Sequence, residues 1–345
     1  MILEELLKWI LSNWGALAQV VLLPGVAFVL LFTVVAIWFE RKYLARSMLR
    51  IGPLHTGRVA GWLQIIADFI KLTGKESITP EDADGTLFNV LPILSVGVSA
   101  VAMAFIPFSR DWIIYNGGGI SLLLFLGVTS LVLYLPLMMG WTSNNKYTMI
   151  GSLRMAYLYI SAEIPLFSSA MGVAILAGSF DLVSIVEAQS RVWFILPQLL
   201  GFLVFFVAFL AEVERVPFDI PVAEQEIVAG WRTEYGGINL GIAMMMDYVP
   251  LCAWTLLLVT LYLGGYQGPI LFGSQLLSNF FWIMFKFGVV VAIVLLLRSV
   301  FPRLRIDQTL RLSWCYLTPM AFINLLLTAF VTSFFPGLLN IAGVP

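Results

Sequence analysis

Two charged residues lie inside long apolar segments, where an ionisable side chain can pair with another charge or transfer a proton. Glu163 is near the middle of the apolar segment 152–178, and Lys286 is inside the segment 279–298. A charge at the bilayer centre costs roughly 2.5–3.5 kcal/mol, so such groups usually face a polar cavity, pair with an opposite charge or relay protons. We therefore expect Glu163 to face a polar cavity, to pair with a cation or to relay protons. Lys286 is a similar case, unless its long side chain reaches the membrane surface.

A second set of ionisable residues forms a loop between two apolar segments. Its charged members are Glu212, Glu214, Arg215, Asp219, Glu224, Glu226, Arg232 and Glu234. Pro217 and Pro221 exclude one regular helix through the loop, because proline lacks an amide hydrogen and clashes with the preceding turn. Two interpretations remain open. The loop is either a solvated surface for a soluble partner protein or a chain of carboxylates that pass protons, with pKa values raised by burial and lowered by cations.

Eight apolar segments are long enough to position these charges in a membrane, since a spanning helix needs roughly 20 mostly apolar residues. They are 16–38, 87–108, 120–140, 152–178, 193–211, 240–264, 279–298 and 314–335. The first is too long and starts too late for a standard cleavable signal peptide. We predict an all-α integral membrane protein, with a single polytopic domain over 1–345. Arg154 and Asp247 stand near the starts of their segments, where each is functional or simply marks the membrane interface.

The composition agrees with a membrane protein. Hydrophobic residues make up 60% of the chain and charged residues 11%, whereas a soluble domain carries about 25% charged residues. The net charge of −1 gives no basic field for nucleic acid. Two isolated cysteines, Cys252 and Cys315, cannot complete a four-ligand zinc site or hold an iron–sulfur cluster. We therefore expect no metal site in this chain.

Basic residues predict how the helices are oriented. Of the 19 Lys and Arg residues, all but four fall on one side, after the odd-numbered helices. The exceptions are Lys8, Arg110, Arg191 and Lys286. Because basic loops face the cytoplasm, both termini are predicted to lie outside and the acidic loop, about 212–238, to lie inside.

The segment at about 59–75 is predicted to be a separate amphipathic helix. One helical face carries Trp62, Ile65, Ile66, Phe69 and Ile70, and another carries Gln64, Asp68 and Lys71. This spacing is typical of an amphipathic helix. The segment is too short and too charged to span, so we place it at the cytoplasmic membrane surface. The alternative is a helix that packs under the bundle.

Four groups of residues, in order along the chain, match a known pattern. The first is Trp38-Phe39-Glu40-Arg41-Lys42, Arg50-Ile51-Gly52-Pro53, Ala67-Asp68, Lys71 and Lys75-Glu76; the second is Gly140-Trp141, Ser143-Asn144, Lys146-Tyr147 and Gly151-Ser152-Leu153-Arg154. The third is Ala211-Glu212, Arg215, Pro217-Phe218-Asp219, Glu224, Glu226-Ile227-Val228, Gly230 and Glu234-Tyr235; the fourth is Pro302-Arg303, Arg305, Asp307-Gln308, Trp314, Pro319 and Asn324. Together they resemble the H subunit of complex I, which is the mitochondrial NADH dehydrogenase subunit 1 family.

The resemblance implies which residues form a quinone chamber and which carry protons away from it. The chamber and its entrance would comprise Glu40, Arg41, Lys42, Trp62, Asp68, Arg215, Phe218 and Asp219. The proton path would comprise Asp68, Arg154, Glu163, Glu212, Glu224, Glu226, Glu234, Asp247 and Lys286. The chain departs from the family at Val222, where many members have a glutamate. The acidic funnel would therefore have one fewer acid.

The resemblance also implies partners and an exchangeable substrate. A quinone or methanophenazine would enter from the lipid bilayer, and iron–sulfur clusters would lie in partner subunits. Those partners would be the iron–sulfur and large hydrogenase-like subunits of a soluble arm, small membrane subunits and antiporter-like subunits. The run Pro217-Phe218-Asp219-Ile220-Pro221, followed by Ala223-Glu224-Gln225-Glu226, resembles the archaeal branch. That branch includes F420H2 dehydrogenases, and also hydrogenase or sulfane reductase complexes that bind no quinone.

Our leading hypothesis is a non-catalytic membrane subunit of a proton-pumping respiratory oxidoreductase, in the inner or plasma membrane. A second hypothesis keeps the fold and drops the quinone, as in a membrane-bound hydrogenase complex. A third, a stand-alone secondary transporter, is allowed by intramembrane charge alone. We see no repeat of matched broken helices to support it. A purely structural anchor would not need buried carboxylates.

Overall fold

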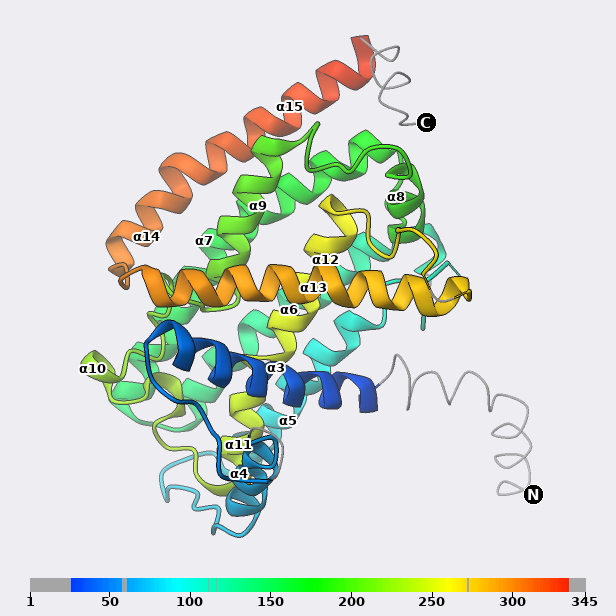
Figure 1. Ribbon diagram of the computed structural model, residues 1–345. Coiled ribbons are helices and arrows are strands. Elements are labelled where there is room, and N and C mark those ends of the chain that lie inside the picture. Colours follow the sequence, from blue (N-terminus) through cyan, green and yellow to red (C-terminus); the bar gives the residue numbers. More distant parts are fainter. Residues whose placement is uncertain (1–25, 58–60, 111, 116, 272, 335–345) are drawn as a thin grey trace, which may run out of the picture.

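The structure is a computed structural model that describes residues 26–57, 61–110, 112–115, 117–271 and 273–334, without the side chains of Val26, Gly117, Glu224 and Gln225. The described residues form helices and connecting loops (Figure 1). Six helical spans are long and apolar enough to cross a membrane: α5 (Gly85–Met103), α6 (Ser121–Thr142), α7 (Lys146–Ala177), α11–α12 (Gly237–Tyr262), α13 (Gln275–Val300) and α14–η3–α15 (Ile306–Phe334). The all-α membrane fold expected from the sequence is thereby confirmed.

Two further apolar helices match the remaining expected segments. α3 (Val26–Ser47) begins at the edge of the described chain, so residues 16–25 of the first expected segment lie outside it. α9 (Leu199–Glu212) has only 14 residues. Residues 193–198, which were expected to begin this helix, are not helical. In this segment the Ile195 amide donates to the Tyr262 carbonyl at 3.1 Å. The count of about eight spanning helices therefore stands as an approximation.

Several expected boundaries were wrong, and each error has a local cause. α3 continues to Ser47, which places Arg41, Lys42 and Arg46 on the helix and not in a loop. α7 begins at Lys146 because the Asn145 side chain caps it by accepting the Tyr147 amide at 2.9 Å. The pattern of apolar residues does not reveal such a polar first turn of a helix, because capping residues precede the apolar run.

The sixth expected helix is interrupted. α11 (Gly237–Met245) and α12 (Val249–Tyr262) flank a turn at Met246–Tyr248 that contains Asp247. Pro250 stands in the first turn of α12, where its missing amide hydrogen costs least. The break places Asp247 in the turn between the two helices, inside the apolar span Gly237–Tyr262.

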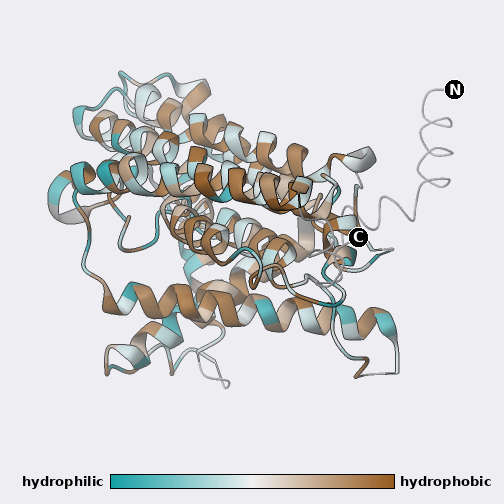
Figure 2. Ribbon diagram, turned by 90° about the horizontal axis from the view of Figure 1, so that it is seen from above, coloured by the Kyte–Doolittle hydropathy of each residue, from teal (hydrophilic) through white to brown (hydrophobic). Residues whose placement is uncertain are grey.

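α7 is the central helix of the bundle and contacts α6, α9 and α15. The main core is aromatic where α6, α9 and α12 meet. The Phe125 and Trp254 rings are 5.2 Å apart, edge to face, and Phe205 packs against Trp254 at 6.4 Å. Hydrophobic residues run along most of each long helix, while hydrophilic residues gather toward helix ends and loops (Figure 2). This distribution suits a hydrocarbon layer around the middle of the bundle.

α3 and α13 run side by side in the same direction (Figure 1). Their packing is aromatic, with the Phe32 and Phe287 ring centroids 4.4 Å apart. The ends of both helices, at Ser47 and Val300, lie on the side of the molecule that holds the acidic loop. α3 and α13 therefore bring distant charged residues to one place.

The amphipathic helix is shorter than expected. α4 covers Gln64–Thr73, and residues 58–60 lie outside the described chain. Ile65 is its one buried residue, whereas Ile66, Phe69 and Ile70 are exposed. α4 touches α11 and α3. The helix therefore packs under the bundle by one edge and leaves most of its apolar face uncovered, as a helix at a membrane surface would.

Candidate functional site

The acidic loop, 212–238, is held against the bundle by a close backbone contact. It contains two short helices, α10 (Glu224–Ile227) and η2 (Gly230–Arg232), after an irregular stretch around Pro217 and Pro221. A Cβ atom at Gly151 of α7 would lie 2.7 Å from the Gly230 Cα atom. Gly151 therefore lets the loop approach α7 more closely than any side chain would permit.

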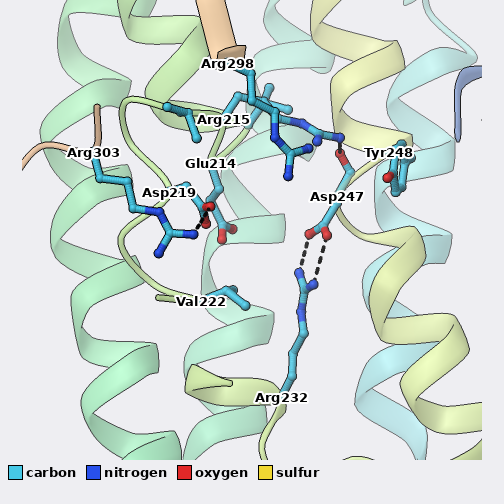
Figure 3. A pocket seen from close by; sticks show the side chains of 11 residues that line it. Glu214, Arg215, Asp219, Val222, Arg232, Asp247, Tyr248, Arg298 and Arg303 are labelled. Carbon is cyan, nitrogen blue, oxygen red and sulfur yellow. Dashed lines mark hydrogen bonds and ion pairs between the residues drawn. The ribbon is translucent and has the colours of Figure 1, made fainter. Parts of the chain in front are cut away.

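A polar cavity of about 330 Å³ lies beneath this loop (Figure 3). Its ionisable lining consists of Glu214, Arg215, Asp219, Arg232, Asp247, Tyr248, Arg298 and Arg303. These residues come from the loop, from the break between α11 and α12, from the end of α13 and from the segment that follows α13. Val222, where many family members carry a glutamate, also lines the cavity. The chain therefore collects both signs of charge around one cavity.

Glu40 is the most deeply buried acid of this region. It is 3% exposed on α3, and its Oε1 atom accepts from Arg215 Nη1 at 2.9 Å and from Arg298 Nη1. Arg215 also donates to the Asp247 backbone carbonyl at 3.3 Å. Burial lowers the pKa of Arg215, but the combined attraction of Glu40, Tyr248 and Asp247 outweighs burial, so the net effect is a raised pKa. Buried charges persist when they are paired in this way, since removing one partner leaves the other uncompensated.

Two more ion pairs surround the cavity, as Figure 3 shows. Arg232 donates to both carboxylate oxygens of Asp247, one at 2.8 Å from Nη1. Arg303 donates to Asp219 at 2.9 Å. The Arg232–Asp247 pair is bidentate, the arrangement that fixes a carboxylate most firmly. It ties η2 to the break in the α11–α12 span.

Glu214 and Tyr159 form a hydrogen bond at the inner wall. The Tyr159 hydroxyl donates to Glu214 Oε1 at 2.5 Å, and Glu214 Oε2 is buried without a described partner. The pKa of Glu214 is raised to about 7, most strongly by burial and next by repulsion from the Asp247 carboxylate. Its backbone has φ of 51°, a sparsely populated conformation for a residue other than glycine. Glu214 is therefore held where it can exchange a proton near neutral pH.

Glu212 and Glu163 continue from this point toward the middle of the bundle. Glu212, at the end of α9, is 6% exposed and its Oε2 atom has no described partner. A small cavity of about 10 Å³ is lined by Glu212 and Tyr159, a volume near the minimum that holds one water molecule. Glu163 on α7 lies within electrostatic range of Glu212 and accepts from the Ser130 hydroxyl of α6.

The remaining expected proton-path acids lie toward the outer edge of the loop. Glu226 is largely exposed and pairs with Arg154 at 2.5 Å, and Glu234 accepts from Asn145. The Glu224 side chain lies outside the described part of the chain. Arg154 is two turns inside α7, so it does not mark the start of a helix as one interpretation held. Its partner Glu226 shows that Arg154 fastens α10 to α7.

Lys286 is separated from these acids. Its Nζ atom donates to the Gly265 and Gln267 carbonyls at 2.9 and 2.8 Å and lies 4.9 Å from the Trp193 ring centroid. Those residues belong to loops at the end of the bundle opposite the acidic loop. The structure therefore does not bring Lys286 together with the other expected proton-path residues, and it is buried without snorkelling.

The expected chamber residues divide into two groups. Glu40, Arg215 and Asp219 belong to the charged cluster described above, whereas Phe218 is 2% exposed and packs into the main core. Arg41, Asp68 and Trp62 meet beside α4. Arg41 donates to Asp68 at 2.5 Å, Gln64 donates to Asp68 at 3.1 Å, and the Trp62 and Trp38 rings are 6.1 Å apart.

Sequence reasoning assigned neither to the chamber nor to the proton path these members of the site: Ser130, Tyr159, Glu214, Arg232, Tyr248, Arg298 and Arg303. Tyr159 precedes Glu163 by four residues on α7, and this spacing places both on one helical face. That spacing was the available signal. Arg298 was recognised only as a basic residue at the end of a helix, because its partner Glu40 is 258 residues away in the chain. Among the described residues no group of three or more His, Cys, Asp or Glu side chains is placed to hold a metal ion.

Comparison with known proteins identifies the family. The profile of the NADH dehydrogenase family matches residues 20–329. The NADH-quinone oxidoreductase H subunit of Brevibacillus brevis is 40% identical over 337 residues, 98% of both chains. The corresponding H subunit of Geobacillus thermodenitrificans is 41% identical over 89% of this chain and 92% of its own. That of Dehalococcoides mccartyi is 41% identical over 91% of this chain and 86% of its own.

The chain belongs to the H-subunit family of NADH-quinone oxidoreductases. The resemblance in the four groups of residues is thereby confirmed. The names of these relatives refer to NADH and quinone, and they give no support to the expected likeness to archaeal F420H2 dehydrogenases. As a member of this family with six long apolar spans, the chain is a multi-pass membrane protein.

Proposed function

We propose that this chain is the membrane subunit that couples quinone reduction to proton translocation in a complex I-like oxidoreductase. The carrying observation is the cluster under the acidic loop, where the Glu40–Arg215–Arg298 triad and the Arg232–Asp247 pair surround a polar cavity. Glu214 stands in that cavity with a pKa of about 7, raised by burial. The H-subunit relatives at 40–41% identity support the quinone as the substrate.

Carboxyl groups of this chain would change their protonation when charge appears on a quinone that accepts electrons. A carboxyl group with a pKa near the ambient pH changes protonation in response to a small change in local potential. Glu214 has this property and Tyr159 connects it to the interior. A proton would then pass through Glu212 to Glu163, with a water in the small cavity beside Glu212. In this proposal the residues hold and move protons, and the redox chemistry occurs in partner subunits.

Glu226, Glu234 and Glu224 form the outer part of this proposed path. Glu226 is held by Arg154 and Glu234 by Asn145, so each is already fixed against α7 or its capping residue. Arg41, Lys42, Trp62 and Asp68 would line the place where a quinone enters from the bilayer beside α4. This assignment is supported by the exposed apolar face of α4.

The proposal extends to orientation, domain and partners. The acidic loop would face the cytoplasm and both termini the opposite side, because the basic residues gather on the loop side. The chain would form one membrane domain over 1–345. Its soluble partners would be the iron–sulfur and large hydrogenase-like subunits at the acidic loop. Small membrane subunits and antiporter-like subunits would contact the apolar helices.

A photoreactive quinone analogue tests the proposal in the intact complex purified from native membranes. We expect labelling of this chain within residues 40–75 or 212–235, and we expect the native quinone to compete the label away. Absence of labelling in a complex that still transfers electrons and pumps ions would overturn the quinone assignment. That result would favour the quinone-free hydrogenase-type assembly instead.

A further inference from the structure

Pro165 leaves one backbone carbonyl of α7 without its usual helical donor. In a regular helix the Ser161 carbonyl would accept the amide hydrogen of residue 165, but proline has no such hydrogen and its ring crowds that carbonyl. Ser161 is 1% exposed, so bulk water does not reach it. A carbonyl without a donor is costly in the apolar interior of a membrane protein, and a side chain from a neighbouring helix commonly serves it.

The donor comes from the last membrane span. The Ser313 hydroxyl donates to the Ser161 carbonyl, and both residues are buried. Ser313 begins η3 (Ser313–Leu317), a π-helical turn within this span. The Thr318 amide and the Thr318 hydroxyl both donate to the Ser313 carbonyl, the hydroxyl at 2.9 Å. The backbone that carries the Ser313 hydroxyl is therefore fixed by its own turn.

The π-helical turn keeps one face of the last span against the bundle. Thr309 and Thr328 are both buried, and 19 residue steps separate them. Five turns of an α-helix take about 18 residues. The wider turn at η3 absorbs the extra residue, so both threonines lie on the same face, and α14, η3 and α15 all contact α7. Single π-helical turns of this kind occur frequently at functional sites.

The turn of α7 that Ser313 holds also carries Glu163. Successive residues of an α-helix are rotated by about 100°, so Ser161 and Glu163 point to nearly opposite sides of α7. Ser313 holds one side of the turn. On the other side Glu163 accepts from the Ser130 hydroxyl of α6. The direction of the Glu163 side chain therefore depends on the turn between Ser161 and Pro165.

We propose that Ser313 is a positioning residue for Glu163. Its hydroxyl takes the place of the amide hydrogen that Pro165 lacks, and it fixes the turn so that Glu163 stays on Ser130. Without this hydroxyl the Ser161 carbonyl has to find another donor, and the turn moves Glu163 away from Ser130. This role of Ser313 rests on the proposed function, in which Glu163 carries a proton.

The number of protons pumped per quinone reduced tests this role in proteoliposomes of the intact complex. We expect Ser313→Ala to lower that ratio at least about twofold while quinone reduction continues, because the loss of a buried donor shifts the populations of the turn. The matched control is Ser169→Ala. It removes another buried hydroxyl of α7, one that donates to the Leu166 carbonyl of the same helix at 2.8 Å. The control should leave the ratio unchanged.

Replacing the proline gives the decisive readout, since alanine at position 165 supplies the missing amide hydrogen. We expect Ser313→Ala to lower the ratio when Pro165 is present and to have no effect in a Pro165→Ala chain. If Ser313 only packed the last span against α7, the loss would be the same in both backgrounds. The thermal inactivation temperatures of the same four complexes should follow the same pattern, and they do not depend on how well Pro165→Ala pumps.

Three results would overturn the proposal: an unaltered ratio in an assembled Ser313→Ala complex, an equal loss in Ser169→Ala, or an equal loss with either residue at position 165. If Ser313→Ala alone does not assemble, assembly should return with Pro165→Ala, and its failure to return would also overturn the proposal. Glu163→Gln separates this role from the proposed function. Loss of pumping there, with full pumping in Ser313→Ala, refutes the positioning role alone, whereas full pumping in Glu163→Gln refutes the proposed function.

Discussion

At the scale of single residues, Glu214 is the group most clearly tuned for proton exchange. Its pKa of about 7 follows from burial and from the Asp247 carboxylate, with Arg232 and Tyr159 acting in the opposite direction. We predict that Glu214→Gln lowers quinone reduction by at least about tenfold, the scale of a lost general acid–base group. The pH profile of the rate should also lose its inflection near pH 7. A variant with the unaltered rate and the same inflection would remove Glu214 from the path.

The same pKa makes a prediction about stability. In the folded chain the pKa of Glu214 lies above its usual value of 4.5, because burial favours the protonated form. Folding is therefore favoured by this group at low pH, and that contribution is lost as the pH rises from about 4.5 through 7. We expect the thermal inactivation temperature of the complex to fall less between pH 5 and pH 8 in Glu214→Gln than in the unaltered protein. An equal fall in both would contradict this account.

At the scale of elements, the acidic loop depends on the contact between Gly151 and Gly230. A Cβ atom at position 151 would stand 2.7 Å from the Gly230 Cα atom and from the Trp231 amide nitrogen. We predict that Gly151→Ala costs about 1–3 kcal/mol, the usual scale of overpacking, and displaces η2 with Arg232. Thermal inactivation should occur at a lower temperature, and quinone reduction should fall.

Gly97→Ala on α5 is the matched control for this prediction. Nothing lies within 4 Å of a Cβ atom at Gly97, and alanine favours a helix over glycine. The control variant should therefore be as stable as the unaltered protein or more stable. Equal loss of stability in both variants would show that the effect belongs to glycine replacement in general and not to the loop contact.

The sequence predicted the apolar elements well and the contacts between them poorly. Segments such as 120–140 and 279–298 lie almost wholly within α6 and α13, because each is dominated by its own apolar residues. The Glu40 triad could not be predicted, since its partners stand 175 and 258 residues away and meet only when α3 packs beside α13. The end of α3 was missed for the same reason. Glu40 ends the apolar segment in the sequence, but it does not end the helix, because Arg215 and Arg298 from other parts of the chain pair with it.

At the scale of the whole molecule, the distribution of charge predicts the orientation in the membrane. Lys146, the first residue of α7, and Arg191, which follows α8, are both exposed. In a Cys315→Ser background, we predict that Lys146→Cys reacts with a membrane-impermeant maleimide only in inside-out vesicles and that Arg191→Cys reacts only in right-side-out vesicles. Cys252 is buried and should stay unreactive. The reverse pattern would place the acidic loop outside and contradict the proposed coupling to a cytoplasmic soluble arm.

The central claim is that buried carboxylates of this chain couple quinone reduction to proton movement. It is tested most directly by recording both processes in the same proteoliposomes of the intact complex with Glu163→Gln, which keeps the Ser130 contact region but cannot carry a proton. Glu187→Gln, on the opposite end of the bundle and paired with Arg110, is the matched control. We predict an assembled Glu163→Gln complex with proton pumping lost and quinone reduction slowed, and a control with both intact. Full quinone reduction with full proton pumping in Glu163→Gln would contradict the account.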